Sequence, residues 1–402
     1  MLEVVYALGI ALAFYYAWNM GANDAANPTD CAVGSGVLSL KKAFILFAIF
    51  TATGGIILGP FVMKTIDRGL IAREELETQK LILGSFVASL AACLWVTFSS
   101  WKGMPVSTTH SVIGGVLGFG LLISPGLINH GVLFTVILSL LLSPLLSILL
   151  SFGLFRPARN YFSRERKHGN VILVYFVTYF LSFITSVSVL YKLLEWDKLS
   201  AVVGSLTISF LPPSILITSM WKKYKTFKNE FVLSSLLIVS LCFSALSFGA
   251  NDMANATGVF VTPTQRLIGE PTLLTMFLLS ILGATGILIG GLTWGYRVIS
   301  TCAYRVTRLD PLMGMVAEFS NALTVFLFTV VPTFLMGFGI PVSTTHSSIG
   351  TIIGVGLARG GMGALHKPTT LKILLFWILT IPCVALLSIV LFVLLGHGLG
   401  IA

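Results

Sequence analysis

Two short polar motifs each occur twice in this otherwise apolar chain. Pro-Val-Ser-Thr-Thr-His-Ser stands at Pro105–Ser111 and again at Pro341–Ser347. Gly-Ala-Asn-Asp-x-Ala-Asn stands at Gly21–Asn27 and again at Gly249–Asn255, so the order is the same in both halves. A seven-residue identity indicates an internal duplication. Polar clusters interrupted by Gly and Pro at matched places in two apolar halves are typical of a transport pathway through a membrane.

The Asn-Asp motifs have the side chains needed to hold a cation. Asp24 and Asp252 adjoin apolar spans, where a charge costs at least about 2.5–3.5 kcal/mol unless something offsets it. Amide, carboxylate and freed carbonyl oxygens are hard ligands that suit sodium. Helix capping is the simpler interpretation, but it explains two matching clusters poorly. The predicted sodium ligands are Asn23, Asp24 and Asn27 in one copy and Asn251, Asp252 and Asn255 in the other.

The Ser-Thr-Thr motifs have the donors needed to bind an anion. Each follows a proline that suits a helix start, and a helix N-terminus offers free N–H groups and a positive dipole end. The hydroxyls add donors, so two such starts facing each other could hold a tetrahedral oxyanion. The alternative is that these hydroxyls only satisfy helix backbone within lipid. The predicted anion-binding residues are Ser107, Thr108, Thr109, Ser343, Thr344 and Thr345.

Three further residues within the apolar spans can carry or share a proton. Glu318 lies inside a span, where an acidic residue is a functional candidate, either as another sodium ligand or as a proton carrier. His110 and His346 close the two Ser-Thr-Thr motifs, and we interpret them as structural hydrogen-bonding residues, with proton coupling as the alternative. A nucleophilic enzyme is disfavoured because the chain has no nucleophile elbow.

These motifs must be positioned by membrane-spanning helices. The chain has 402 residues, of which 56% are hydrophobic and 10% charged, whereas a soluble domain has about 25% charged residues. Stretches of roughly 20 apolar residues predict an all-α polytopic protein with about twelve spans, of which the two after Pro105 and Pro341 are short and could be re-entrant. The spans are 2–20, 43–63, 81–100, 105–123, 130–155, 171–191, 200–221, 231–250, 273–296, 311–336, 341–359 and 373–396.

Charge and cysteine content exclude other classes of protein. The net charge of +10 comes from residues scattered over short loops, so it does not predict nucleic-acid binding. Most Lys and Arg residues lie on one side of the predicted spans, which places both termini outside the cell membrane. The five cysteines lack disulfide or zinc spacing, so we interpret them, Cys31 included, as small buried apolar residues.

The predicted topology inverts one copy relative to the other. Seven crossings separate the two Asn-Asp motifs, and an odd number of crossings reverses orientation. We therefore predict a first inverted repeat over residues 1–155, linking spans and loops over 156–230, and a second inverted repeat over 231–402. Inverted repeats give a transporter two related states, each open to one side.

The paired motifs resemble those of the inorganic phosphate transporter (PiT) family, most closely its compact prokaryotic sodium/phosphate symporters. The resemblance covers nearly the whole chain, from Gly21 to about Gly360. It implies that the Asn-Asp motifs handle ions and substrate, that the Ser-Thr-Thr segments cradle phosphate, and that Glu318 matches a functional glutamate of the second repeat. It also implies a homodimer. Animal members carry a glutamate where this chain has Thr51, so their ion stoichiometry does not transfer. Thr51 and Thr285 lie in similar stretches of small residues in the two copies, and we interpret both stretches as helix-packing segments.

These features together predict a sodium-coupled symporter that imports inorganic phosphate by alternating access. Its ligands are phosphate and co-transported sodium within the lipid bilayer, without an organic cofactor and without enzymatic activity. Two alternatives stay open on the same fold: a proton-coupled symporter of phosphate or metal–phosphate, and a sulfate permease. An anion channel or a membrane enzyme is a more distant third class.

Overall fold

The protein is described here by a computed structural model. It describes residues 2–66, 70–71, 75–164, 167–225, 227–257, 263–264, 267, 269, 272–336 and 342–401. Within these ranges the chain is almost entirely helical, and an isolated β-bridge joins Ile71 and Ile128. The all-α prediction is therefore confirmed.

The helices follow the apolar stretches of the sequence. In chain order they are α1 (Leu2–Asp24), α2 (Ala26–Gly34), α3 (Leu40–Ile66), α4 (Thr78–Trp101), α5 (Thr108–Ile123), α6 (His130–Phe162), α7 (Lys167–Ser188), α8 (Lys198–Ile208), α9 (Leu211–Tyr224), α10 (Asn229–Thr257), α12 (Leu273–Gly290), α13 (Tyr296–Arg305), α14 (Pro311–Met336), α15 (Thr344–Gly360) and α16 (Lys367–Leu399).

The helix lengths suit a membrane. Among the described residues, eight helical segments are long and apolar enough to cross a bilayer by length and composition. Large apolar side chains on the outer helices are exposed, for example Leu149 on α6 and Ile378 on α16. Such exposure suits contact with lipid rather than with water. The predicted span 200–221 is divided into α8 and α9, and the number of crossings stays a prediction.

The two halves pack reciprocally. Helix α1 lies against α12 while α10 lies against α3, and α5 lies against α16 while α15 lies against α6. Each motif helix of one half therefore contacts a helix of the other half. The first glycine of each Asn-Asp motif permits this approach, because a Cβ on Gly21 would overlap the Ile287 carbonyl and a Cβ on Gly249 would overlap the Thr51 carbonyl.

The close approaches also show which residues are equivalent. Thr51 occupies the position against α10 that Ile287 occupies against α1. Thr285, two residues earlier, is exposed and its hydroxyl donates to the Ile281 carbonyl. The hydroxyl of Thr51 is buried and donates to the Ala245 carbonyl. Thr51 therefore lies at a close helix contact, in agreement with the predicted packing role, and the residue at the equivalent position of the second copy is the apolar Ile287.

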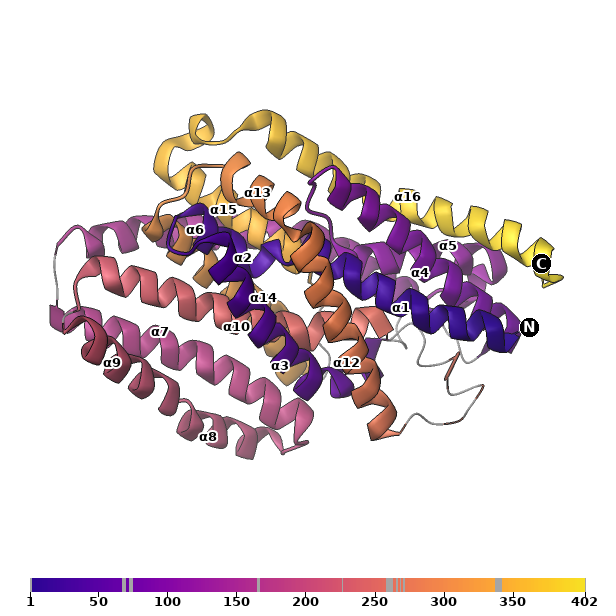
Figure 1. Cartoon of the computed structure of the whole chain (residues 1–402), viewed down its shortest axis with the longest axis horizontal. Coiled ribbons are helices and arrows are strands. Elements are labelled where there is room, and N and C mark those ends of the chain that lie inside the picture. The colour runs from indigo at the N-terminus through magenta and orange to yellow at the C-terminus, as the bar shows by residue number, and fades with distance from the viewer. Residues whose placement is uncertain are drawn as a thin grey trace.

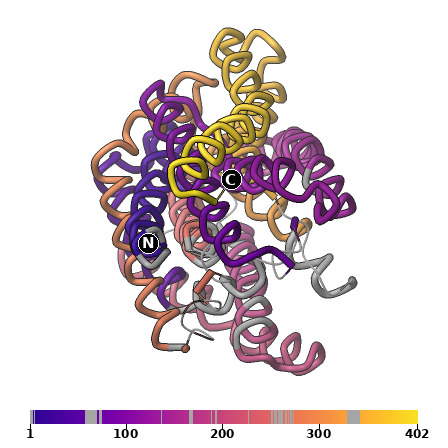
Figure 2. Tube along the Cα trace, turned by 90° about the vertical axis from the view of Figure 1, so that its right-hand side faces the viewer, coloured from indigo at the N-terminus to yellow at the C-terminus, as the bar shows by residue number. Residues whose placement is uncertain are grey.

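The remaining helices lie at the edges. Figure 1 shows α7, α8 and α9 as a group on one side of the molecule, and this group falls within the predicted linking segment. The start of α1 and the end of α16 lie at the same end of the molecule in both views (Figures 1 and 2). The side of the membrane on which the termini lie stays a prediction.

Candidate functional site

The first Asn-Asp motif lies at a break between two helices. Helix α1 ends at Asp24 and α2 begins at Ala26. Pro28 has no N–H to donate to the carbonyl of Asp24, four residues before it, so the hydrogen-bond ladder is interrupted there. The proline fits in the first turn of α2, where N–H groups lack helical acceptors. The break therefore places the Asp24 carboxylate and a freed backbone carbonyl at the same point.

Asp24 is the centre of the site. Its carboxylate is only 1% exposed. Thr108 at the start of α5 donates its hydroxyl to Oδ2 at 2.7 Å, and Thr345 at the start of α15 donates its hydroxyl to Oδ1 at 3.3 Å. One carboxylate thus accepts hydrogen bonds from both copies of the Ser-Thr-Thr motif. This contact joins the two motif types that the sequence analysis assigned separately to a cation and to an anion.

Asn23 holds the segment that leads into α5. Its Oδ1 accepts from the backbone N–H of Val106 at 2.9 Å, and its Nδ2 donates to the Met104 carbonyl and the Ser100 hydroxyl. These bonds fix the extended chain before the helix start. An amide oxygen has two lone pairs, so one lone pair of Oδ1 stays available to a cation.

Asn27, one turn after Asn23, reaches the other copy. Its Nδ2 donates to the hydroxyls of Thr344 and Thr345 at 3.2 and 3.1 Å. The single O–H of Thr345 is shared between Oδ1 of Asp24 at 3.3 Å and the Val106 carbonyl at 3.4 Å, which links α15 to the segment before α5. The first Asn-Asp motif therefore contacts both Ser-Thr-Thr motifs.

The two helix starts have matching caps. The hydroxyl of Ser107 accepts from the backbone N–H of His110 at 3.1 Å, and the hydroxyl of Ser343 accepts from that of His346 at 3.2 Å. Each serine acts as a helix N-cap and keeps its own O–H as a donor. Thr109 and Thr344 are half-buried, and the other four predicted anion-binding residues are buried. Pro341 lies outside the described residues.

The two motif histidines lie beside each other. The ring centroids of His110 and His346 are 5.1 Å apart, and both side chains are buried. His346 also stacks on Trp377 of α16, whose indole N–H donates to the Pro105 carbonyl. These ring contacts brace the two helix starts. The predicted hydrogen-bonding role is not seen, because Nδ1 of His110 and both ring nitrogens of His346 are buried without a hydrogen-bond partner among the described residues.

The second Asn-Asp motif lies within α10. Asp252 is 3% exposed on α10, which packs against α1, the helix of Tyr16 and Asp24. Tyr16 donates its hydroxyl to the Thr108 carbonyl at 2.6 Å. The side chains of Asn251 and Asn255 lie outside the described residues. The two aspartates of the duplicated motif thus lie on two helices that pack against each other.

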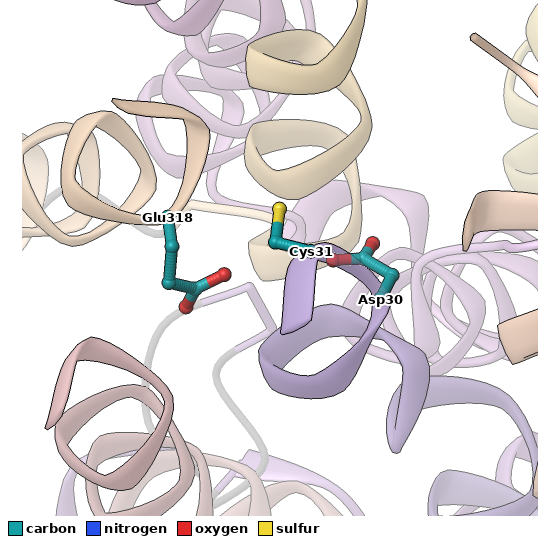
Figure 3. A group of neighbouring side chains, drawn as sticks. All are labelled: Asp30, Cys31 and Glu318. Carbon is teal, nitrogen blue, oxygen red and sulfur yellow. The ribbon is translucent and has the colours of Figure 1, made fainter. Parts of the chain in front are cut away.

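Glu318 is buried on α14 but does not contact the Asp24 group through any described hydrogen bond. It accepts from the hydroxyl of Ser244 on α10 and lies near Asp30 and Cys31 of α2 (Figure 3). The structure therefore places this predicted sodium ligand in a neighbouring acidic cluster.

Asp30 was not predicted as a site residue, although its position in the sequence is informative. It is an acidic residue six positions after Asp24, and it is fully buried in α2. An acidic residue among membrane helices is by default a functional candidate. Tyr16 had no comparable signal, because an aromatic residue in an apolar span looks like an ordinary packing residue.

Comparison with known proteins assigns this arrangement to one family. Residues 20–388 match the family model described as the phosphate transporter family. The chain is 33% identical to a protein of Pyrococcus abyssi named “putative phosphate permease”, over 96% of this chain and 95% of the relative. It is 31% identical to a protein of the same name from Chlamydia muridarum, over 95% and 96% of the two chains.

A solved structure extends the likeness to three dimensions. The protein described as “The sodium-dependent phosphate transporter” matches with a TM-score of 0.85 and 28% identity, over 98% of this chain and 99% of that one. The family consists of membrane transporters rather than enzymes, in agreement with the apolar helices of this multi-pass chain. On its sequence and on its fold, this chain belongs to the phosphate transporter family.

Proposed function

We propose that this chain is a sodium-coupled symporter that imports inorganic phosphate by alternating access. The observation that carries the proposal is the position of Asp24, which accepts hydroxyl groups from the starts of both α5 and α15. A cation ligand is thus in direct contact with the groups suited to bind an anion. Binding of one kind of ion must then affect binding of the other.

Sodium is assigned to the two Asn-Asp motifs. Asp24 and Asp252 are both buried, and ionised carboxylates at these positions repel each other and cost free energy in the membrane interior. Sodium ions at these carboxylates remove both penalties and use the neighbouring amide and backbone oxygens as hard ligands. The assigned ligands are Asn23, Asp24 and Asn27 with Asn251, Asp252 and Asn255, and Glu318 contributes negative charge from the neighbouring cluster.

Phosphate is assigned to the space between the starts of α5 and α15. Thr108 and Thr345 donate to Asp24. A sodium ion on that carboxylate competes with the hydroxyls for its oxygens, which releases them to donate to phosphate. Ser107 and Ser343 keep their O–H groups as donors, and the two helix dipoles favour an anion. Sodium therefore prepares the anion site, and phosphate in turn holds the sodium ions.

Alternating access follows from inverted repeats over residues 1–155 and 231–402, with 156–230 as the linking segment. The reciprocal packing of α1 on α12 and α10 on α3 supports this division. The loaded site closes and reopens on the other side when the two halves exchange conformations. Inward movement of net positive charge gains about 2.3 kcal/mol per charge for each 100 mV.

Labelled-phosphate uptake into proteoliposomes tests the proposal. An inward sodium gradient should drive accumulation, and replacement of sodium by potassium should abolish it. Accumulation without sodium under a pH gradient would instead favour proton coupling, for which the paired histidines and Glu318 are the candidates. Unlabelled sulfate that displaces labelled phosphate at equal concentration would favour a sulfate permease.

A further inference from the structure

A second cluster of potential ligands lies beside the proposed transport site. One ligand atom from each of Asp30, Cys31 and Glu318 lies within 4.8 Å of the other two, and all three residues are at most 1% exposed. Figure 3 shows Glu318 reaching from α14 toward Cys31 and Asp30 on α2. The three residues are buried far more deeply than the surface acidic groups that gather without a ligand.

Each carboxylate of this cluster has one oxygen held and one oxygen open. Ser348 of α15 donates to Oδ2 of Asp30 at 2.8 Å, and Ser244 of α10 donates to Oε1 of Glu318. Within the described part of the chain, no hydrogen bond of ordinary geometry reaches Oδ1 of Asp30 or Oε2 of Glu318, and the Cys31 thiol lies beside both carboxylates. A buried carboxylate oxygen left in this way is costly. Serine bonds that orient carboxylates whose other oxygens stay open are the pattern found around metal ligands.

A third buried oxygen without a described hydrogen-bond partner lies on α14, the helix of Glu318. Oδ1 of Asn321, one turn after Glu318 on α14, is also buried without a partner among the described residues. Residues three apart share a helix face. This oxygen is therefore a candidate for a fourth ligand.

The charge and the sulfur decide the class of ion. Two buried carboxylates and a thiol that can lose its proton call for at least a divalent cation. Sodium, magnesium and calcium prefer oxygen alone, whereas zinc and cobalt accept cysteine sulfur together with carboxylate oxygen. In the sequence, Cys31 looks like a small packing residue; its position between two acids gives it a different chemistry.

The spacing fits such an ion after a small movement. Tetrahedral ligands around zinc are separated by roughly 3.5 Å, since the metal–ligand bonds are about 2.0–2.3 Å long. Ligand atoms within 4.8 Å of one another need only side-chain rotation to reach that separation. We propose that Asp30, Cys31 and Glu318 form a binding site for a divalent transition metal of the zinc class, separate from the sodium and phosphate sites. This proposal does not depend on sodium coupling.

Cobalt binding to the full chain in detergent tests the proposal. Cobalt reports a thiolate ligand by a charge-transfer absorption band in the near ultraviolet, and the protein should be incubated to equilibrium because the site is buried. We expect one cobalt ion to bind per chain, and we expect the absorption band to disappear when zinc displaces the cobalt. Cys31→Ser should remove the band, and Asp30→Asn or Glu318→Gln should raise the cobalt concentration at half-saturation at least about tenfold. Cys93→Ser, which changes an equally buried thiol on α4, is the matched control.

Thermal unfolding separates ligand loss from misfolding. Zinc should raise the Tm of the unmodified chain and of Cys93→Ser, and it should leave the Tm of Cys31→Ser unchanged. A chain that shows no cobalt–thiolate band, or a band that survives both carboxylate changes, would overturn the proposal. Because no phosphate or sodium is needed, failure here is distinguishable from failure of the symport proposal.

Discussion

The two Asn-Asp motifs are nearly identical in sequence, yet they lie in helices of different shape. In the first copy the motif is divided between α1 and α2, and in the second it lies within the continuous α10. The first copy has Pro28 where the second has Ala256. A single missing N–H accounts for the interruption. The two copies thus keep the same Asn and Asp side chains, while Pro28 in the first copy leaves a backbone carbonyl oxygen without its helical N–H donor.

The acidic cluster is a second difference between the copies. Asp30 follows the first motif, whereas Gly258 stands at the matched place after the second. Residues present in both copies meet around Asp24, whereas Asp30 and Cys31 of the first half meet Glu318 of the second half in a cluster that the duplication does not repeat. The repeated residues are therefore suited to a substrate that both halves must handle, and the unrepeated residues to a separate task at a contact between the halves.

The largest expected effect tests whether the two aspartates are equivalent. Asp24→Asn and Asp252→Asn should each reduce sodium-driven phosphate uptake more than 100-fold and weaken its sodium dependence, because removing one partner of a buried ion pair costs about 3–5 kcal/mol. Uptake into proteoliposomes at several sodium concentrations measures this. Asp197→Asn changes an exposed acid at the start of α8 and should have no effect. Unchanged sodium activation in both aspartate variants would refute the assignment.

The next effect compares the two threonines that donate to Asp24. Thr108→Val should raise the phosphate concentration at half-maximal uptake by about 10- to 100-fold, since hydrogen bonds to charged groups contribute about 1.5–3 kcal/mol. Thr345→Val should have a smaller effect because its bond is longer, 3.3 Å against 2.7 Å. Thr53→Val, which removes an exposed hydroxyl bonded within its own helix, is the control. Equal effects of Thr53→Val and Thr108→Val would contradict the site.

The close helix approaches should be equally sensitive in the two copies. Gly21→Ala and Gly249→Ala force a Cβ into a carbonyl of the opposing helix and should each lower the free energy of unfolding by about 1–3 kcal/mol. Thermal unfolding in detergent measures the change. Gly153→Ala on α6 meets no atom within 4 Å and should be neutral or stabilising. If Gly153→Ala destabilises the chain and Gly21→Ala and Gly249→Ala do not, the described contacts of α1 with α12 and of α10 with α3 are incorrect.

The smallest effect concerns the helix break itself. Pro28→Ala makes the first copy match Ala256 of the second and restores an N–H that can bond to the Asp24 carbonyl. Because one such hydrogen bond contributes about 0.5–1.5 kcal/mol, sodium should activate uptake at about two- to tenfold higher concentration. The reverse change, Ala256→Pro, is the matched comparison. If Pro28→Ala leaves the sodium dependence as it was, the freed carbonyl is not a sodium ligand.

Much of the fold could be predicted from the sequence because a helix that crosses a membrane needs a stretch of about 20 apolar residues. Apolar length defined the helices, and proline with serine defined the starts of α5 and α15 to within a few residues. The repeated motifs predicted Asp24, Thr108 and Thr345 as site residues, and their binding roles stay a prediction. Their mutual contact could not be predicted, since it joins residues from distant parts of the chain.

The residues that were not predicted either occur in only one copy, as Asp30 does, or look like apolar packing residues, as Tyr16 does. Asp30 stands in only one copy, so a search by duplication passes over it. The sequence also gave no reason to separate Glu318 from the sodium ligands, because its neighbours on α2 and α10 become neighbours only through packing. Which acidic residues share a cluster is decided by helix packing, which a single sequence does not encode locally.

The bond between Asp24 and Thr345 has a consequence for how the protein is made. These residues are 321 positions apart, whereas Asp24 and Thr108 are 84 apart. At about 5–20 residues per second, Thr108 is synthesised within roughly 4–17 s of Asp24, and Thr345 only after roughly 16–64 s. During that interval the nascent first half must keep a carboxylate in the bilayer with one of its two helix partners missing. Membrane insertion of this chain therefore includes a waiting period, in which the first half depends on the insertion machinery, on lipid headgroups or on water to shelter Asp24.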